Sequence, residues 1–339
     1  MPMFAKKTEM PTPLDGVDVL LADLDGVVYR GRNALPHAVD SLNRAAESMR
    51  VGYITNNASR TDVSVAEHLT ELGLRVAPDE VVTSPQAAVR LLAEQVTAGS
   101  RILVIGGEGL RDEVRKAGFA IIASADDEPA AVIQGFSADL GWRDLAEASF
   151  ALAGGDDGIP WVATNTDWTI PVERGIAPGN GTLVSAVHSA VGRLPLVAGK
   201  PEVAIFTEAV ARFGAQKPLF IGDRLDTDIL GANRAGIASL MVLTGVDTAK
   251  QLLAAAEDSR PRYILDDLRG LHQPYPETST GRDGRVSVGG ASVRVRGRDV
   301  DIVREGDGGI DLLRAACAAI WGSGTPIYAL DVPERLYAG

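Results

Sequence analysis

Four short polar motifs in the sequence contain residue types that can carry chemistry: carboxylates, an amine, a hydroxyl and side-chain amides. They are Asp23-Leu24-Asp25-Gly26, Thr55-Asn56-Asn57, Gly199-Lys200-Pro201 and the acidic segment 222–228. Three of them directly follow short apolar runs, and ligands in open α/β sheets bind beyond the carboxyl ends of the strands. Each motif alone is typical of a turn or a helix cap. Their shared position at the ends of elements predicts one common site.

The residue types favour phosphoryl chemistry at that site. A carboxylate can attack phosphorus to form an aspartyl phosphate, and Asp23 is the first carboxylate beyond its apolar run. Asp25 is the expected general acid, which protonates the leaving oxygen and later activates water. Because an anion attacks an anion, positive charge is required. Lys200 would supply a point charge, Thr55 a hydroxyl donor, and backbone N–H groups around Asn56 a cradle for phosphate oxygens.

Carboxylates on separate loops also predict a bound cation. Asp23, Asp25 and Asp223 offer the oxygen ligands that Mg²⁺ prefers, one of them through a backbone carbonyl. The single cysteine, Cys317, excludes an internal disulfide and a Cys-rich zinc site, and the four scattered histidines do not suggest a His-based cluster. The expected cofactor is therefore Mg²⁺.

The composition narrows the class of protein. The chain has 339 residues, 45% of them hydrophobic and 23% charged, which is ordinary for a globular protein of two or three domains. Its net charge of −12 argues against binding to nucleic acid or to anionic membranes. No apolar run is long enough for a transmembrane helix, and residues 1–13 lack the apolar core of a secretory signal. A cytoplasmic location is expected.

The chemistry-bearing motifs need a scaffold, and the apolar pattern predicts an α/β fold. Strand and helix alternate from the start: strand 17–21, a helix after Pro36, strand 51–55 and helix 61–72. Further strands are expected at 101–105, 131–134, 161–164, 219–221, 239–243 and 263–264. The glycine cluster 106–109 lacks the dinucleotide spacing G-x-G-x-x-G, so it predicts a strand-to-helix turn.

Taken together, the four motifs resemble the haloacid dehalogenase superfamily of phosphohydrolases, over about residues 15–270. This resemblance implies that Asp23 is the nucleophile and Asp25 the acid/base. It implies Mg²⁺ held by the Asp23 carboxylate, the Asp25 carbonyl and Asp223, with help from Asp228. The residues implied to bind phosphate are Thr55, Asn56, Asn57 and Lys200.

The spacing of the motifs predicts an inserted domain. The stretch from Thr55 to Lys200 exceeds by about 100 residues what a single crossover needs. We expect a Rossmann-like parallel-sheet core over 1–97 and 194–272, with an α/β cap domain inserted over 98–193. That arrangement resembles the family branch of NagD-like and 4-nitrophenyl phosphatases with a large cap, as do the segments 164–167, 178–181 and 197–201.

The cap of that branch would lie over the phosphate site and choose the leaving group. Asp167, Trp168 and Arg174 are the specificity candidates, with packing inside the cap as the alternative for Trp168. The chain is also similar to bacterial glycerol-3-phosphate phosphatases, which favours a small phosphometabolite and glycerol 3-phosphate first. A sugar-phosphate or nucleotide phosphatase, a phosphotransferase or mutase, and a non-catalytic binding protein are the alternatives.

The end of the chain departs from this pattern. Residues 273–284 read as a linker, and alternating valines after it predict a small antiparallel pair or meander followed by a helix over 310–321. This α+β extension, 285–339, faintly resembles a fragment of the N-acetyltransferase fold, although Asp307 stands where that fold's loop has glycine. We expect packing or regulation as its role, with a homo-oligomer through the cap or the extension as an alternative, and Cys317 as a buried small hydrophobe.

Overall fold

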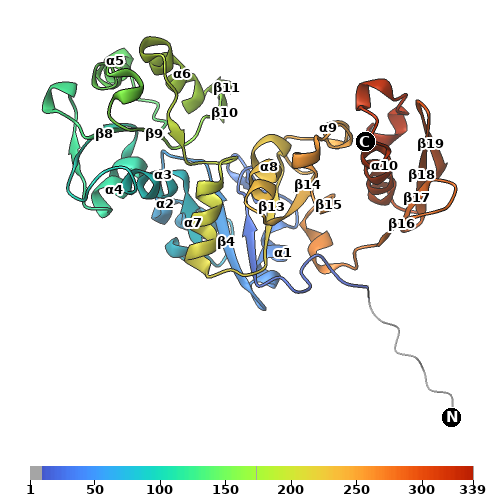
Figure 1. The fold of residues 1–339 in the computed structure, drawn as a ribbon. Coiled ribbons are helices and arrows are strands. Elements are labelled where there is room, and N and C mark those ends of the chain that lie inside the picture. Colours follow the sequence, from blue (N-terminus) through green and yellow to red (C-terminus); the bar gives the residue numbers. More distant parts are fainter. Residues whose placement is uncertain (1–9, 173, 339) are drawn as a thin grey trace.

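A six-stranded parallel sheet occupies the middle of the computed structural model, which describes residues 10–172 and 174–338 (Figure 1). Its strands, in spatial order, are β15 (Tyr263–Leu265), β14 (Ala238–Val242), β13 (Pro218–Gly222), β1 (Val19–Ala22), β4 (Arg50–Thr55) and β5 (Val81–Thr83). All four residues of β1 are buried, as expected for a strand covered on both faces. Val19 and Leu21 join one apolar cluster and Leu20 and Ala22 the other, because successive side chains point to opposite faces.

Helices cover both faces of this sheet. One face carries α1 (Ala38–Ala45) and α2 (Asp62–Glu71), and the other carries α3 (Ser84–Ala93), α7 (Val203–Phe213) and α8 (Leu230–Arg234). A short hairpin, β2 (Tyr29–Arg30) with β3 (Asn33–Ala34), follows β1 directly. The α/β class expected from the sequence is confirmed, with strand ends mostly within a residue or two of the expected positions.

A second parallel sheet lies between β5 and α7 in the chain. Its five strands are β12 (Leu196–Val197), β9 (Trp161–Ala163), β8 (Ala131–Gln134), β6 (Arg101–Ile105) and β7 (Ala120–Ile122). We call residues 101–197 the inserted unit. Its last strand lies beyond the expected boundary at 193, because Leu196 pairs with Val162 and so extends this sheet.

Three helices and a hairpin complete the inserted unit. They are α4 (Glu108–Lys116), α5 (Trp142–Ala151), α6 (Asn180–Val191) and the antiparallel strands β10 (Thr169–Val172) and β11 (Gly175–Pro178). The expected turn at 106–109 is present, since β6 ends at Ile105 and α4 begins at Glu108.

The end of the chain forms a four-stranded antiparallel meander with one helix. Its elements are β16 (Thr278–Thr280), β17 (Arg285–Val288), β18 (Ala291–Arg296), β19 (Asp299–Arg304) and α10 (Gly309–Ser323). We call residues 278–338 the extension. The expected linker 273–284 is shorter than predicted, because β16 lies within it and pairs with β17.

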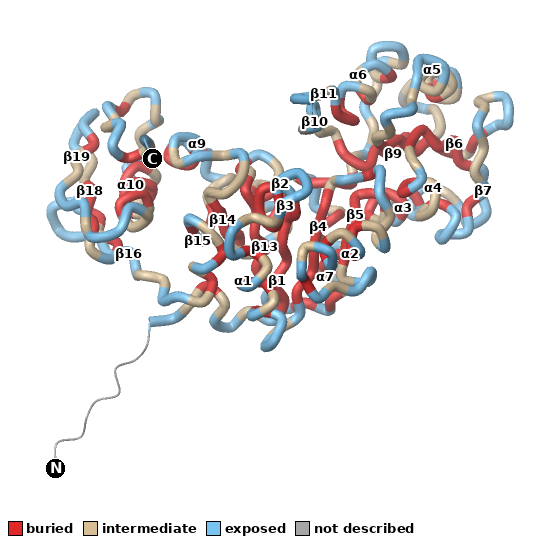
Figure 2. The backbone as a smooth tube through the Cα atoms, turned by 180° about the vertical axis from the view of Figure 1, so that it is seen from behind, coloured by how far each residue is buried: buried red, intermediate tan, exposed pale blue. Residues whose placement is uncertain are grey.

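The inserted unit and the extension lie at opposite ends of the six-stranded sheet, as both Figure 1 and Figure 2 show. Figure 2 shows buried segments both in the central strands and in α10. One continuous apolar cluster joins α9 (Ala249–Leu253) and β15 to α10, so the extension docks on the core through its helix. Cys317 is buried in that cluster, as expected. Within the described residues, no helix is long and apolar enough to cross a membrane.

Candidate functional site

The chain places the four motifs at one edge of the six-stranded sheet. Ala22, the last residue of β1, pairs with Tyr53 of β4 on one side and Ile221 of β13 on the other. The residues that follow these three parallel strands therefore emerge side by side. Asp23 follows β1, Thr55 ends β4 and Asp223 follows β13.

A buried ion cluster lies at the centre of this edge. Lys200 Nζ donates to Asp23 Oδ1 at 2.6 Å and to Asp228 Oδ1 at 2.7 Å. Lys200 is only 4% exposed and Asp228 only 1%. Such charges remain buried only when they are paired and hydrogen-bonded. Burial by itself lowers the pKa of Lys200, but the carboxylates of Asp228 and Asp23 outweigh it, so the net shift is upward and the amine stays charged.

The carboxylates of this cluster carry raised pKa values. Burial is the largest cause for Asp23, whose pKa rises to about 7 although Lys200 opposes the shift. Burial also raises the pKa of Asp223 to about 8, and repulsion from Asp228 and Asp23 adds to it. Among the described residues, Lys200 is the one cation paired with these carboxylates, so the cluster has an excess of negative charge when all three are ionised.

This donor set fits a divalent cation. Carboxylate oxygens of Asp23, Asp223 and Asp228 lie within 4.8 Å of one another. Asp223 Oδ1 is buried without a hydrogen-bond partner among the described residues, which leaves it a natural ligand for a cation. Its other oxygen, Oδ2, accepts from the Val246 backbone N–H at 2.7 Å. Mg²⁺ takes oxygen ligands of this kind and needs a few carboxylates rather than a full protein cage.

Two glycines allow the close approach of the backbone to Asp223. A Cβ on Gly26 would lie 2.3 Å from Asp223 Oδ2, and one on Gly245 would lie 1.8 Å from the same oxygen. Gly26 also has a φ of +84°, a conformation that favours glycine. The glycine of the first motif is therefore required by packing as well as by its turn.

Asp25 lies apart from the carboxylate cluster. Its side chain is exposed, while its backbone pairs with Tyr29 at the start of the hairpin β2–β3. Desolvation by its surroundings raises its pKa, against the opposing charges of Lys200 and Arg60. A carboxyl group that holds its proton more readily than usual suits a general acid.

Asn56 is committed to protein contacts. Its Nδ2 donates to Asp167 Oδ2 at 3.1 Å and to the Lys200 carbonyl at 3.0 Å, and its Oδ1 accepts from the Lys200 N–H at 2.8 Å. The Asn56 side chain therefore connects the second motif to Lys200 of the third motif and to Asp167 of the inserted unit. Asn57 N–H donates to Thr55 Oγ1 at 3.1 Å, so these neighbours support each other's positions.

Of the three specificity candidates, the structure brings one into contact with the motifs. Asp167 reaches Asn56, and its pKa is raised by burial in spite of the Asn56 hydrogen bond and the charge of Lys200. Trp168 is 66% exposed, so packing inside the inserted unit does not account for its side chain. Arg174 is exposed in the turn between β10 and β11.

Two features of this edge were missed by the sequence prediction. Arg224, beside Asp223, has a pKa raised by Asp226 and Asp167 against the effect of burial, and it pairs with Asp226 at 2.9 Å. The segment 243–248 after β14 touches Asp223 through backbone N–H groups. Its position was one signal, since β14 ends at the same edge as the other strands, and Gly245 was another.

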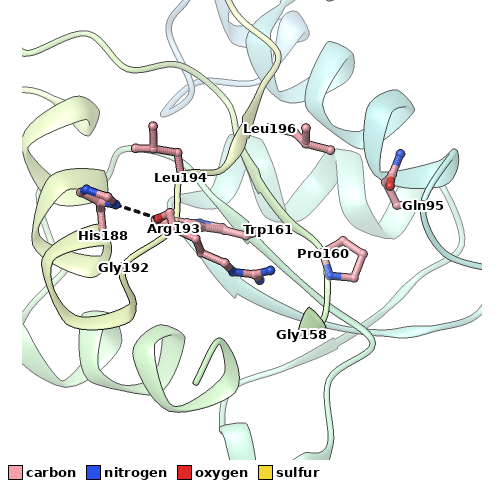
Figure 3. Close-up of a pocket in the computed structure, with 9 residues that line it drawn as sticks. All are labelled: Gln95, Gly158, Pro160, Trp161, His188, Gly192, Arg193, Leu194 and Leu196. Carbon is pink, nitrogen blue, oxygen red and sulfur yellow. Dashed lines mark hydrogen bonds between the residues drawn. The ribbon is translucent and has the colours of Figure 1, made fainter. Parts of the chain in front are cut away.

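A pocket of about 510 Å³ lies elsewhere, in the inserted unit (Figure 3). The residues that line it are Gln95, Gly158, Pro160, Trp161, His188, Gly192, Arg193, Leu194 and Leu196. The view shows His188 bonded to the backbone of Arg193 at its rim. None of the predicted site residues lines this pocket, so it does not bear on the chemistry of the acidic edge.

Comparison with known proteins agrees with this geometry. A family described as haloacid dehalogenase-like hydrolase matches residues 20–120, and a second, described as HAD-hydrolase-like, matches residues 197–271. A D-glycerol 3-phosphate phosphatase of Mycobacterium tuberculosis is 46% identical over 307 residues, which cover 90% of this chain and 86% of that protein. The chain belongs to the haloacid dehalogenase-like hydrolases. The resemblance drawn from the four motifs is thus confirmed.

Other members of the haloacid dehalogenase-like hydrolases match over most of their length. A glycerol-3-phosphate phosphatase of Gallus gallus is 38% identical and covers 76% of this chain and 92% of that protein. A glycerol phosphate phosphatase of Mycobacterium tuberculosis, solved in complex with magnesium, superposes with a TM-score of 0.85 at 44% identity, over 94% of each chain. A p-nitrophenyl phosphatase from Archaeoglobus fulgidus gives 0.68 at 28% identity, over 75% of this chain and 98% of that one. The predicted cofactor, Mg²⁺, agrees with the magnesium complex and with the acidic cluster.

Proposed function

We propose that this protein is a Mg²⁺-dependent phosphomonoesterase that converts glycerol 3-phosphate to glycerol and inorganic phosphate. The observation that carries the proposal is the buried cluster in which Lys200 pairs with Asp23 and Asp228 beside Asp223 Oδ1, which has no hydrogen-bond partner in the described part of the chain. The names of the relatives at 46% and 38% identity support glycerol 3-phosphate as the substrate. A relative at 34% identity is named an acid sugar phosphatase, so sugar phosphates are the second candidates.

Asp23 is the proposed nucleophile. Its Oδ1 is held by Lys200, which leaves Oδ2 to attack phosphorus. The attack forms an Asp23–phosphate bond and breaks the bond between phosphorus and the ester oxygen. When bound, Mg²⁺ would reduce the repulsion between the carboxylate and the phosphate; Asp23, Asp223, Asp228 and the Asp25 carbonyl are the proposed ligands.

Asp25 is the proposed proton carrier. It gives its proton to the leaving oxygen as the first bond breaks, which releases neutral glycerol. It then takes a proton from the water that attacks phosphorus, and the Asp23–phosphate bond breaks to release phosphate. Its exposed position and raised pKa support both halves of this cycle.

Thr55, Asn57 and Lys200 are the proposed phosphate-binding side chains, and Asn56 belongs to the same motif. Because the Asn56 amide is occupied by Asp167 and by the Lys200 backbone, we assign its side chain a positioning role and only its backbone to phosphate binding. This assignment narrows the one drawn from the motif alone.

The inserted unit is the proposed cap. We place it at the predicted 98–193 with its sheet continued to Val197. Asp167 would accept a hydrogen bond from a hydroxyl of the leaving group. Trp168 lies just before the β10–β11 hairpin and Arg174 lies in its turn, and both are exposed. A cytoplasmic location and a homo-oligomer through the cap or the extension stay predictions from the sequence.

Phosphate release from a panel of esters tests this proposal. The panel contains glycerol 3-phosphate, sugar phosphates, nucleotides and 4-nitrophenyl phosphate, each with Mg²⁺ and with EDTA. We expect Mg²⁺-dependent release with glycerol 3-phosphate preferred, and no release by Asp23→Asn. Wild-type-like turnover in Asp23→Asn would refute the nucleophile, and preference for another ester would refute the substrate.

A further inference from the structure

A loop outside the four motifs holds Asp223 in place. The segment 243–248 connects β14 to α9, and its Val246 N–H donates to Asp223 Oδ2 at 2.7 Å. The next residue, Asp247, donates its N–H to the Asp223 carbonyl at 3.2 Å and accepts from the Leu225 N–H at 2.7 Å. The 243–248 loop therefore contacts the side chain and the backbone of Asp223, and it also contacts Leu225 in the turn that follows Asp223.

This loop ends in a helix that is too short to set its own position. Helix α9 has five residues, and isolated helices of that length are not stable in water. Its Leu252 and Leu253 are buried in the apolar cluster that contains Leu312, Leu313 and Ala316 of α10. The position of α9 thus comes from packing, and part of that packing is supplied by the extension.

The same apolar cluster reaches the acidic motif directly. Leu225 and Ile229, which flank Asp228 in the chain, belong to it together with Met241 of β14. Residues on the two sides of Asp228 therefore share a continuous core with the extension. Both routes, through α9 and through this core, connect α10 to the proposed metal ligands.

A largely but not fully buried arginine fixes how α10 sits on the sheet. Arg314 donates from Nε and Nη2 to the Ile264 carbonyl of the edge strand β15, at 2.9 and 2.6 Å. Its third nitrogen pairs with Asp311 at 2.8 Å, and its guanidinium lies 4.3 Å from the centre of the Tyr275 ring. Its side chain is 10% exposed, so a shift of α10 would leave a desolvated charge without these partners.

We propose that the extension, residues 278–338, is a positioning element for Asp223 and thereby sets the Mg²⁺ affinity of the site. Docking of α10 fixes α9 and the 243–248 loop, and that loop orients the carboxylate of Asp223. Mutation of the residues that orient metal ligands typically lowers metal affinity or activity by about 10- to 100-fold. The inference rests on the proposed function in one respect, namely that Asp223 binds the metal.

Calorimetric titration of the full-length protein with Mg²⁺ tests the inference without using turnover. The variants are Asp247→Ala, which removes the contact to Leu225, and Arg314→Ala, which removes the contact to β15. The matched control is Arg296→Ala, whose 64% exposed side chain pairs with Asp301 on the extension away from α9. Asp223→Asn reports whether the titrated site is the proposed one.

We expect Asp247→Ala to weaken Mg²⁺ binding about tenfold or more, as for other residues that orient metal ligands. Arg314→Ala acts at a distance, so we expect about threefold or more. Arg314→Lys, which keeps the charge but loses the two-nitrogen fork, should give an intermediate affinity. Arg296→Ala should match wild type, and turnover of Arg314→Ala at saturating Mg²⁺ should stay close to wild type.

Unchanged Mg²⁺ affinity in Arg314→Ala and Arg314→Lys, with a lowered Tm, would overturn the inference, because the extension would then support folding only. Equal weakening in Arg296→Ala would overturn it as well. Failure of the proposed function would be a separate result. In that case wild type would release no phosphate, although the Mg²⁺ affinities of the variants would still differ as expected. Binding unaffected by Asp223→Asn would refute the ligand assignment itself.

Discussion

Lys200 Nζ lies 2.6 Å from Asp23 Oδ1, although the two residues are 177 positions apart in the chain. The same nitrogen lies 2.7 Å from Asp228 Oδ1, so one buried amine joins the first, third and fourth motifs. The arrangement holds the proposed nucleophile in a single orientation and compensates for part of the negative charge around it. Removal of this amine should therefore affect both turnover and stability.

The first prediction concerns Lys200→Met, which keeps most of the side-chain volume. Loss of one partner of a buried ion pair costs about 3 kcal/mol or more of the free energy of unfolding. We expect that loss at pH 8, and a smaller loss at pH 5.5 because the aspartates then accept protons. Urea unfolding in EDTA measures it, and phosphate release should be abolished. An equal loss of stability at both pH values would show that the charge of Lys200 is not the cause.

The second prediction concerns pH and Mg²⁺. The unfolded aspartate pKa is near 3.8, while the folded values rise to about 7 for Asp23 and about 8 for Asp223. Between these limits the metal-free folded state binds more protons than the unfolded state, so the free energy of unfolding falls as pH rises from about 4 to 8. Bound Mg²⁺ would compensate for the negative charge that appears when Asp23 and Asp223 lose their protons.

The rise in Tm caused by saturating Mg²⁺ should therefore be larger at pH 8.5 than at pH 6. Thermal unfolding with Mg²⁺ or EDTA at each pH measures this difference. In EDTA, the Tm of Asp223→Asn should fall less with rising pH than that of wild type, because this variant lacks one titrating group. The same Mg²⁺-induced rise at both pH values would contradict the assigned pKa shifts.

The central sheet and the meeting of the four motifs were predictable because parallel strands end at a common edge. Asp23, Thr55 and Asp223 each follow an apolar run, so their convergence needs no knowledge of side-chain geometry. The burial of Lys200 between two carboxylates is not visible in the sequence, since it depends on how α7 packs against the sheet.

The details that the sequence did not reveal have a physical reason. The motif predicts Asn56 as a phosphate-binding residue, whereas the contacts of its side-chain amide with Asp167 and with the Lys200 backbone depend on the tertiary fold. The 243–248 loop acts through backbone N–H groups, which any residue type supplies, so apart from its position after β14 its one mark in the sequence is Gly245. Strands β12 and β16 are two and three residues long, too short for a periodic pattern.

The third prediction follows from the close packing around Asp223. In Gly245→Ala the added Cβ would lie 1.8 Å from Asp223 Oδ2, so the carboxylate or the loop must move. A displacement of about 1 Å at a reacting centre can cost about 100-fold in rate, and we expect a loss of that order in kcat/KM. Gly322→Ala is the matched control, because beyond the backbone of its own helix no atom of the described residues lies within 4 Å of the added Cβ. Equal kinetics for the two variants would mean that Asp223 need not stay where it is.

The last prediction separates two roles of Asp167. Its carboxylate accepts from Asn56 at 3.1 Å, and we propose that it also accepts from a substrate hydroxyl. Asp167→Asn keeps an oxygen for Asn56 but removes the charge, whereas Asp167→Ala removes both. If substrate binding depends on the oxygen, KM for glycerol 3-phosphate should rise about tenfold in Asp167→Ala and little in Asp167→Asn, with kcat less affected. 4-Nitrophenyl phosphate, which offers no alcohol hydroxyl on its leaving group, should show a smaller change in KM. An equal loss of kcat with both substrates would instead show that Asp167 acts only by holding Asn56. Loss of that contact would loosen the Lys200 backbone and lower the rate of hydrolysis of every ester.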